Sequence, residues 1–153
     1  MDTADGSAPA RLRTLPSWLI NQAALPANRL VIEGLAGAGM RRHHYSLLAT
    51  LDDVGPASQA DLSRRTMIDR SDMVATVNDL AEPGLVERTP DPSDHRRNIV
   101  TITPAGRRQL RKLDRLLANV QDDLLAPLSA RERTQLVGLL TRVVDHHAAR
   151  SDR

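Results

Sequence analysis

Residues 57–88 read ASQADLSRRTMIDRSDMVATVNDLAEPGLVER, and this stretch decides the fold. Ser58 is a residue type favoured at the N-cap of a helix, because its side-chain oxygen can accept a hydrogen bond from a free backbone N–H group. It predicts a short helix from residue 59 to about residue 66, with Leu62 facing the core.

A second helix is predicted directly after the first. Asp69 stands at its N-cap, and Asp72 takes the N3 position where a capping box carries Glu or Gln. The helix is expected to reach about Ala81, because Pro83-Gly84 stops it. Its buried stripe follows spacings of four and three residues: Met73, Val77 and Leu80. Two short helices joined by a tight turn are typical of a helix-turn-helix.

The segment that follows has the pattern of a β-hairpin. Residues 85–88 and 98–103 alternate between apolar and polar side chains, as strands with one buried face do. Between them, Asp91-Pro92-Ser93-Asp94 supplies turn-forming residues. A hairpin directly after a helix-turn-helix is a wing, and its tip here is polar and basic.

Two helices are predicted after the wing. Thr103-Pro104 favours the start of a long helix, in which leucines and a valine recur at 110, 113, 117, 120 and 124. This three-four spacing is typical of a helix–helix seam, buried either within one chain or, as we expect, across the two-fold axis of a homodimer. Ser129 and Glu132 form a capping box for a last helix that ends near Arg150.

The chain before residue 54 is also expected to be helical. A helix over 18–35 has Ser17 as its N-cap, and Pro26 should kink or break it. A further helix is expected over 40–51. The predicted organisation is therefore mainly α with a small β-wing, a winged helix-turn-helix core flanked by N- and C-terminal dimerisation helices. Its segments are a mobile tail (1–13), N-terminal helices (14–53), the winged core (54–104) and C-terminal dimerisation helices (105–150).

Composition excludes several classes of protein. Hydrophobic residues make up 41% of the chain but aromatic residues only 1%, which favours packed helices over a β-sandwich. There is no cysteine, hence no disulfide and no thiolate zinc site. No apolar run is long enough for a membrane span, and the start lacks the apolar region of a signal peptide, so we expect a cytoplasmic protein. The sequence shows no activated nucleophile, no glycine-rich phosphate loop and no paired carboxylates, so we do not expect an enzyme. It implies no cofactor.

The chain as a whole is basic, but its predicted winged core is not. The net charge is +2 and the sequence pI about 9.9, with Lys112 the single lysine among 21 basic residues. Arginine suits bidentate contacts to phosphate and guanine, although an arginine-rich composition also marks GC-rich genomes. Residues 59–103 hold six arginines and eight acidic residues, a net charge of −2. Affinity for DNA must therefore come from the placement of arginines and helix ends, with a clear dependence on salt.

The winged core resembles the MarR (multiple antibiotic resistance regulator) family. The resemblance rests on the IDRS turn into the second helix, the L-x-x-x-GLVER exit, the D-x-R of Asp94 and Arg96, and the V-x-I-T-x-x-G that closes the hairpin. These motifs cover about residues 58–106. The flanking helices match in length and position.

The resemblance implies a homodimeric regulator, usually a repressor, that binds a pseudo-palindromic operator and is often released by a small molecule. The helix over 69–81 would enter the major groove, and Arg96 would enter the minor groove. Asp94 would support the wing, by holding either the Arg96 guanidinium or the turn itself. The expected DNA contacts are Ser58, Gln59, Arg70, Ser71, Asp72, Ala75, Thr76, His95, Arg96 and Arg97.

One feature departs from the family pattern. Val74 and Ala75 stand where the family often carries Thr and Arg, so these positions offer only apolar contact to thymine methyl groups. Together with the −2 balance, this departure supports an alternative reading, a winged-helix module that binds another protein.

Histidines and aromatic residues suggest a pocket. Trp18, His43, His44 and Tyr45 are candidates for an effector pocket, or else for core and interface packing. One histidine from each of the pairs 43–44 and 146–147 could meet a carboxylate across a dimer and bind zinc. The pairs lack a metal-binding spacing such as H-E-x-x-H, however, so we expect surface or pocket-lining histidines and predict no metal site.

Overall fold

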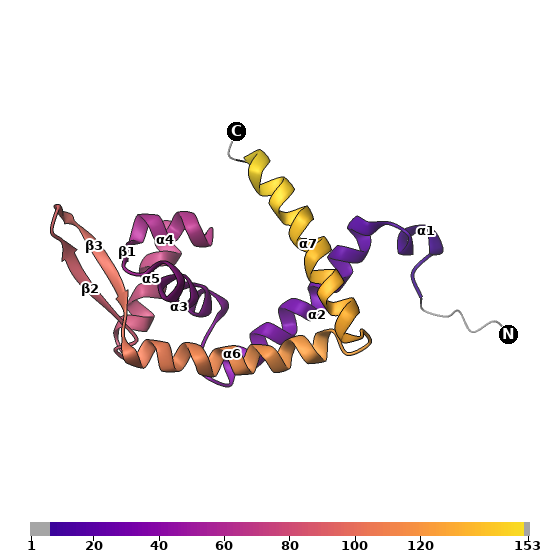
Figure 1. Cartoon of the computed structure of the whole chain (residues 1–153), viewed down its shortest axis with the longest axis horizontal. Helices are drawn as coiled ribbons and strands as arrows, with labels where there is room; N and C mark the ends of the chain where they lie inside the picture. The colour runs from indigo at the N-terminus through magenta and orange to yellow at the C-terminus, as the bar shows by residue number, and fades with distance from the viewer. Residues whose placement is uncertain (1–6, 152–153) are drawn as a thin grey trace. The chain divides into compact units, whose positions relative to one another are not determined.

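The computed structural model describes residues 7–151 (Figure 1). It is mainly α-helical with one small antiparallel sheet, as predicted. In chain order the elements are α1 (Ala10–Arg13), α2 (Pro16–Ala36), α3 (Arg42–Val54), β1 (Ala57–Ser58), α4 (Gln59–Thr66), α5 (Arg70–Ala81), β2 (Val86–Asp91), β3 (Asp94–Ile102), α6 (Pro104–Leu124) and α7 (Ala130–Ser151). The chain divides after Val120 into two compact units, each with its own packing.

The helix-turn-helix forms where the caps predict it. The Ser58 Oγ accepts the backbone N–H of Asp61 at 3.2 Å and so starts α4. Asp69 takes the N-cap position of α5, but its side chain makes no capping hydrogen bond, so the predicted position is confirmed and the predicted bond is not. The expected inward residues are fully buried: Leu62, Met73, Val77 and Leu80.

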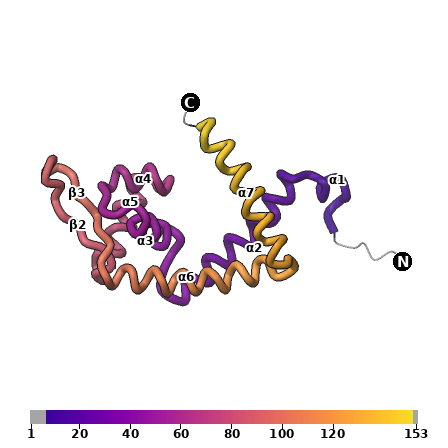
Figure 2. The backbone as a smooth tube through the Cα atoms, viewed as in Figure 1, coloured from indigo at the N-terminus to yellow at the C-terminus, as the bar shows by residue number. Residues whose placement is uncertain are grey.

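The wing is longer than the sequence pattern predicts. The β2–β3 register runs from Val86 opposite Ile102 to Asp91 opposite Asp94, with an irregularity at Pro90/Asp91. The hairpin projects beyond the helices of the first unit (Figure 2), and its outer half is largely exposed on both faces. An exposed hairpin needs no apolar face. The outer half of each strand therefore lacks the alternation of apolar and polar residues from which the strands were predicted.

The sheet also contains a strand that periodicity could not reveal. The two residues of β1 pair with Val100 and Ile99, which gives the strand order β1-β3-β2. At the far end, Asp91 Oδ1 accepts the backbone N–H of Ser93 at 2.9 Å and its hydroxyl at 2.7 Å. These bonds close the turn and lower the pKa of Asp91.

The core of the first unit joins the winged domain to the neighbouring helices. Leu47, Leu48 and Leu51 of α3 and Leu35 of α2 are buried in it. Three residues of the α6 seam are also buried within the chain: Leu110, Leu113 and Val120. Our expectation that this seam lies between two chains is therefore wrong for these residues. Leu110 and Leu113 belong to the core of the first unit, and Val120 lies against Gly34 of α2 in the same chain.

Helices α1 and α2 correct three further expectations. Helix α2 runs unbroken through Pro26, because losing one backbone hydrogen bond in a 21-residue helix leaves the other bonds in place. It starts after Leu15 with Pro16 at its first turn, and Ser17 is not the cap. Residues 10–13 of the predicted mobile tail form α1, while residues 1–6 of that tail lie outside the described part of the chain.

The second unit consists mainly of α7. Its predicted capping box is present: the Ser129 N–H donates to Glu132 Oε1 at 2.9 Å, and the Glu132 N–H donates to Ser129 Oγ at 3.2 Å. These bonds lower the pKa of Glu132. No residue of α7 is buried. Its exposed apolar side chains are Val137, Leu139, Leu140, Val143 and Val144. Within residues 7–151 no helix is both long enough and apolar enough to cross a membrane.

Tyr45, the single tyrosine, links α3 to α6 and should make stability depend on alkaline pH. Its hydroxyl donates to Asp114 Oδ1 at 2.7 Å, and burial, followed by this bond, raises its pKa to about 12. The folded state therefore holds the proton more tightly than the unfolded chain, whose tyrosine titrates near pH 10. The contribution to stability is complete below about pH 10 and is lost between about 10 and 12.

This expectation is checked by denaturant unfolding at a series of alkaline pH values. Tyr45→Phe, which cannot ionise, should flatten the fall in stability over this range. Tyrosinate absorbance reports Tyr45 alone, and a midpoint near pH 10 in the folded protein would contradict the prediction.

Candidate nucleic-acid interface

Helix α5 has a buried face and an exposed face. The exposed side chains along it include Ser71, Val74, Ala75 and Asn78, which recur at helical spacing. Thr76 belongs to the other face: it is only 4% exposed, and its hydroxyl donates to the Asp72 carbonyl at 2.7 Å. The expectation that Thr76 contacts DNA is therefore wrong, because consecutive residues on a helix diverge by about 100° and Ala75 takes the outward direction.

Asn78 is a candidate for contact with DNA bases that was not predicted from the sequence. It lies one turn beyond Val74 on the exposed face, and its Oδ1 accepts a hydrogen bond from the Arg88 guanidinium of β2. An asparagine amide can pair with the edge of adenine in the major groove. The spacing of 71, 74 and 78 was the available signal.

A groove of about 260 Å³ brings together three of the predicted contact residues. Gln59 of α4, Arg70 of α5 and Arg97 of β3 all line it. Ser58 does not: it is 9% exposed, and its hydroxyl is the cap of α4, so a direct DNA contact is not supported for this side chain. The backbone N–H groups and two guanidinium groups around this groove suit an anion such as a phosphate.

The wing tip presents Arg96 freely. Asp94 Oδ1 accepts the backbone N–H of Arg96 at 3.0 Å, and Asp94 Oδ2 lies 3.5 Å from Arg97 Nε. Of the two roles left open for Asp94, it therefore holds the turn and not the Arg96 guanidinium. Arg96 and His95 are exposed, and within residues 7–151 Arg96 forms no ion pair. Its charge is available to a ligand.

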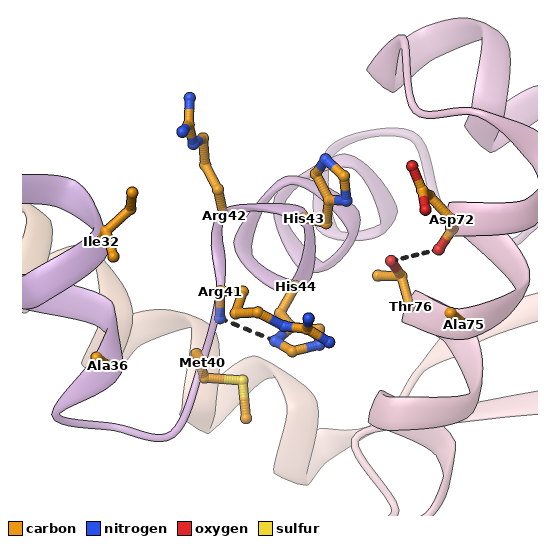
Figure 3. A pocket seen from close by; sticks show the side chains of 10 residues that line it. All are labelled: Ile32, Ala36, Met40, Arg41, Arg42, His43, His44, Asp72, Ala75 and Thr76. Atoms are coloured by element: carbon orange, nitrogen blue, oxygen red, sulfur yellow. Dashed lines mark hydrogen bonds between the residues drawn. The ribbon is translucent and has the colours of Figure 1, made fainter. Parts of the chain in front are cut away.

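A cavity of about 610 Å³ lies among α2, α3 and α5 (Figure 3). His43 and His44 line it as expected, whereas Trp18 and Tyr45 do not. Tyr45 is instead bonded to Asp114, because it follows His44 directly and points about 100° away around the helix. The full lining is Ile32, Ala36, Met40, Arg41, Arg42, His43, His44, Asp72, Ala75 and Thr76.

Five residues that line the cavity were not among the predicted site residues: Ile32, Ala36, Met40, Arg41 and Arg42. Arg41 and Arg42 add positive charge to the lining, and the run RRHH over 41–44 was the signal for them. Asp72 was expected to cap α5 or else to contact a base. Its side chain makes no capping hydrogen bond within residues 7–151, and it lines this cavity (Figure 3). Among the residues between 7 and 151, no cluster of three or more His, Asp or Glu side chains is placed to hold a metal ion.

The fold and the arrangement of α5 and the wing define the class as a winged helix-turn-helix protein. The sequence profile of the MarR family matches residues 38–97. The chain is 33% identical to a probable transcriptional regulator from Pseudomonas aeruginosa of known crystal structure, with a TM-score of 0.75 and coverage of 87% of this chain and 99% of that one. This chain belongs to the MarR family.

Two further comparisons extend this finding. The HTH-type transcriptional repressor NicR of Pseudomonas putida is 33% identical over 101 residues, which are 66% of this chain and 64% of NicR. The chain thus matches less than two thirds of the length of that curated relative. The transcriptional repressor CouR, solved bound to a 23-mer DNA duplex, has a TM-score of 0.80 at 26% identity, with 90% of this chain and 98% of that chain covered.

Proposed function

We propose that this protein is a sequence-specific DNA-binding transcriptional regulator, a repressor that acts as a homodimer on a pseudo-palindromic operator. The observation that carries this proposal is the exposed face of α5 beside the wing. At the wing tip Asp94 holds the backbone of Arg96, and the Arg96 guanidinium forms no ion pair within residues 7–151. The relatedness to NicR, a repressor, and to CouR, which binds a DNA duplex, supports it.

The proposed contacts fall into three groups. Ser71, Val74, Ala75 and Asn78 would face base edges in the major groove, with Val74 and Ala75 against thymine methyl groups. Gln59, Arg70 and Arg97 would hold one phosphate group in the groove that they line, and His95 would add a contact at the wing tip. Arg96 would enter the minor groove, where narrow A·T tracts concentrate negative potential.

Exposed apolar surface supports the homodimer. Helix α7 leaves its apolar side chains uncovered, and α2 does the same with Leu19, Ile20, Leu25 and Ile32. Each helix thus carries several exposed apolar side chains, and large exposed apolar surfaces mark contact surfaces. We assign dimerisation to residues 14–53 and 105–150, and DNA binding to residues 54–104. A two-fold dimer would present two copies of α5 to half-sites one helical turn apart.

The cavity beside α5 is the proposed effector site. Arg41, Arg42 and His43 line it next to apolar groups of α2, a combination suited to a small organic anion. Since Ala75 and Thr76 of α5 also line it, a ligand there would act directly on the proposed reading helix. Catalysis is not part of the proposal, and the cytoplasm, where operator DNA is accessible, is the proposed location.

Fluorescence anisotropy on tiled duplexes from the region upstream of the gene tests this function. The expected result is saturable binding to one near-palindromic duplex at two chains per site, with affinity that falls steeply as salt rises. Weak binding of equal strength to every duplex would overturn the proposal. It would favour instead a winged-helix module that binds another protein, a role consistent with the net charge of −2 over residues 59–103.

A further inference from the structure

A buried histidine connects the start of α3 to α5, the helix proposed to contact the bases. His44 Nδ1 accepts the backbone N–H of Arg41 at 2.9 Å, and His44 Nε2 lies 2.9 Å from Asp79 Oδ2 on α5. The Arg41 guanidinium donates to the same Asp79 oxygen at 2.8 Å. The His44 side chain is only 7% exposed, whereas those of Asp79 and Arg41 are 42% and 76% exposed.

The hydrogen bonds fix the direction of this network. Because the Arg41 N–H donates to Nδ1, that nitrogen carries a lone pair, and the ring proton is assigned to Nε2, which donates to Asp79. Both ring nitrogens are thus used, one to cap α3 and the other to hold α5. The bond from His44, and then the charge and bond of Arg41, lower the pKa of Asp79.

The attachment adds something that apolar packing cannot provide. Met73, Val77 and Leu80 bury α5, but apolar contacts have no preferred direction, so they define the rotation of the helix about its axis less sharply than a hydrogen bond does. Asp79 fixes one side of the helix to α3, and its neighbour Asn78 is bonded to Arg88 of β2 on another side. Two directional bonds on diverging sides of one turn define the rotation of the helix.

We propose that Asp79, held by His44 and Arg41, is a positioning residue that sets the rotation of α5 and thereby the direction in which Ser71, Val74 and Ala75 face the bases. The inference rests on the proposed DNA-binding function. It goes further because it assigns operator discrimination to a network whose buried member, His44, does not itself contact DNA.

The test compares operator with unrelated DNA, because rotation of α5 affects base reading and leaves the phosphate attraction intact. Asp79→Asn keeps the shape of the side chain but weakens the acceptor. Glu82→Gln removes the same charge at the C-cap of the same helix, from a side chain that is exposed and has no hydrogen bond within residues 7–151. The loss of one negative charge should raise affinity by the same factor for every duplex in both variants, so it leaves the ratio of operator to unrelated-DNA affinity unchanged. Only Asp79→Asn should reduce the ratio of operator to unrelated-DNA affinity, by roughly tenfold.

Two further measurements separate positioning from general stability. Arg41→Ala removes the exposed part of the network and should lower the same ratio less, so the test survives if Asp79→Asn does not fold. The nitrogen resonances of His44 should show the proton on Nε2 in the wild type, and the Nε2–H resonance should move in Asp79→Asn. Adding His44→Gln to Asp79→Asn should change the ratio little further, because the network is already broken.

The outcomes are distinguishable. If the ratio of operator to unrelated-DNA affinity is the same in Asp79→Asn, Arg41→Ala, Glu82→Gln and a selective wild type, the positioning role is overturned. The proposed function would then still stand. A wild type without any operator preference overturns the proposed function, and the positioning role falls with it.

Discussion

Replacing Arg96 with alanine is expected to weaken binding to every DNA duplex, operator and unrelated DNA alike, by roughly tenfold. Arg96 stands at the wing tip, and Asp94 holds its backbone while leaving its guanidinium free. A minor-groove arginine responds to groove width and phosphate potential more than to base identity, so its loss should act on all duplexes. The salt dependence should also become shallower by about one unit of the log–log slope.

Two controls sharpen this test by equilibrium titration over a salt series. Arg96→Lys keeps the charge but not the planar guanidinium, and its affinity should fall between those of the wild type and Arg96→Ala. Arg108→Ala removes one exposed arginine from α6 and should have a small effect. Equal affinities for the wild type and Arg96→Ala would show that the wing is assigned wrongly.

Replacing Gly106 with alanine is expected to lower the free energy of unfolding by about 2 kcal/mol. Gly106 lies in the first turn of α6, where an added Cβ would collide with the Leu85 carbonyl oxygen and lie 2.8 Å from Ile102 Cγ1. Forcing a methyl group against backbone costs roughly 3 kcal/mol, and the better helix propensity of alanine returns about 1.

Local bonds make the site of this substitution rigid. The Gly106 N–H donates to Thr103 Oγ1 at 3.0 Å, and the Thr103 hydroxyl is within 2.7 Å of the Gly84 carbonyl oxygen. Gly37→Ala is the matched control, because Gly37 has helical backbone angles and an added Cβ would meet only the Gly34 carbonyl oxygen at 3.8 Å. Chemical denaturation should show little or no destabilisation there. A Gly106→Ala protein as stable as the Gly37→Ala protein would contradict the prediction.

Elements whose signals are local could be predicted from the sequence. Ser58, the Ser129–Glu132 pair and Thr103 mark helix starts through bonds that span three residues, and the structure contains all of these bonds. Features set by distant packing could not be predicted. The continuity of α2 through Pro26, the two-residue strand β1 and the burial of Leu110 and Leu113 depend on segments far away in the chain.

The candidate site divides in the same way. The exposure of Arg96 and the role of Asp94 in the turn follow from a short motif, whereas their contact with DNA stays a prediction. Thr76 and Tyr45 were misplaced because adjacent helical residues point in different directions, and only the packed structure says which direction is inward. Asn78 was missed although its spacing was visible, because its bond to Arg88 joins two elements.

The separation of the two faces of α5 has a consequence for how this protein can diverge. Met73, Val77 and Leu80 carry the packing, while Ser71, Val74 and Ala75 are exposed. Exchanges at exposed positions usually change stability by less than about 0.5 kcal/mol. If these three positions read the operator, a duplicated copy of the gene could acquire a new target sequence through a few exchanges while its fold stayed under separate selection.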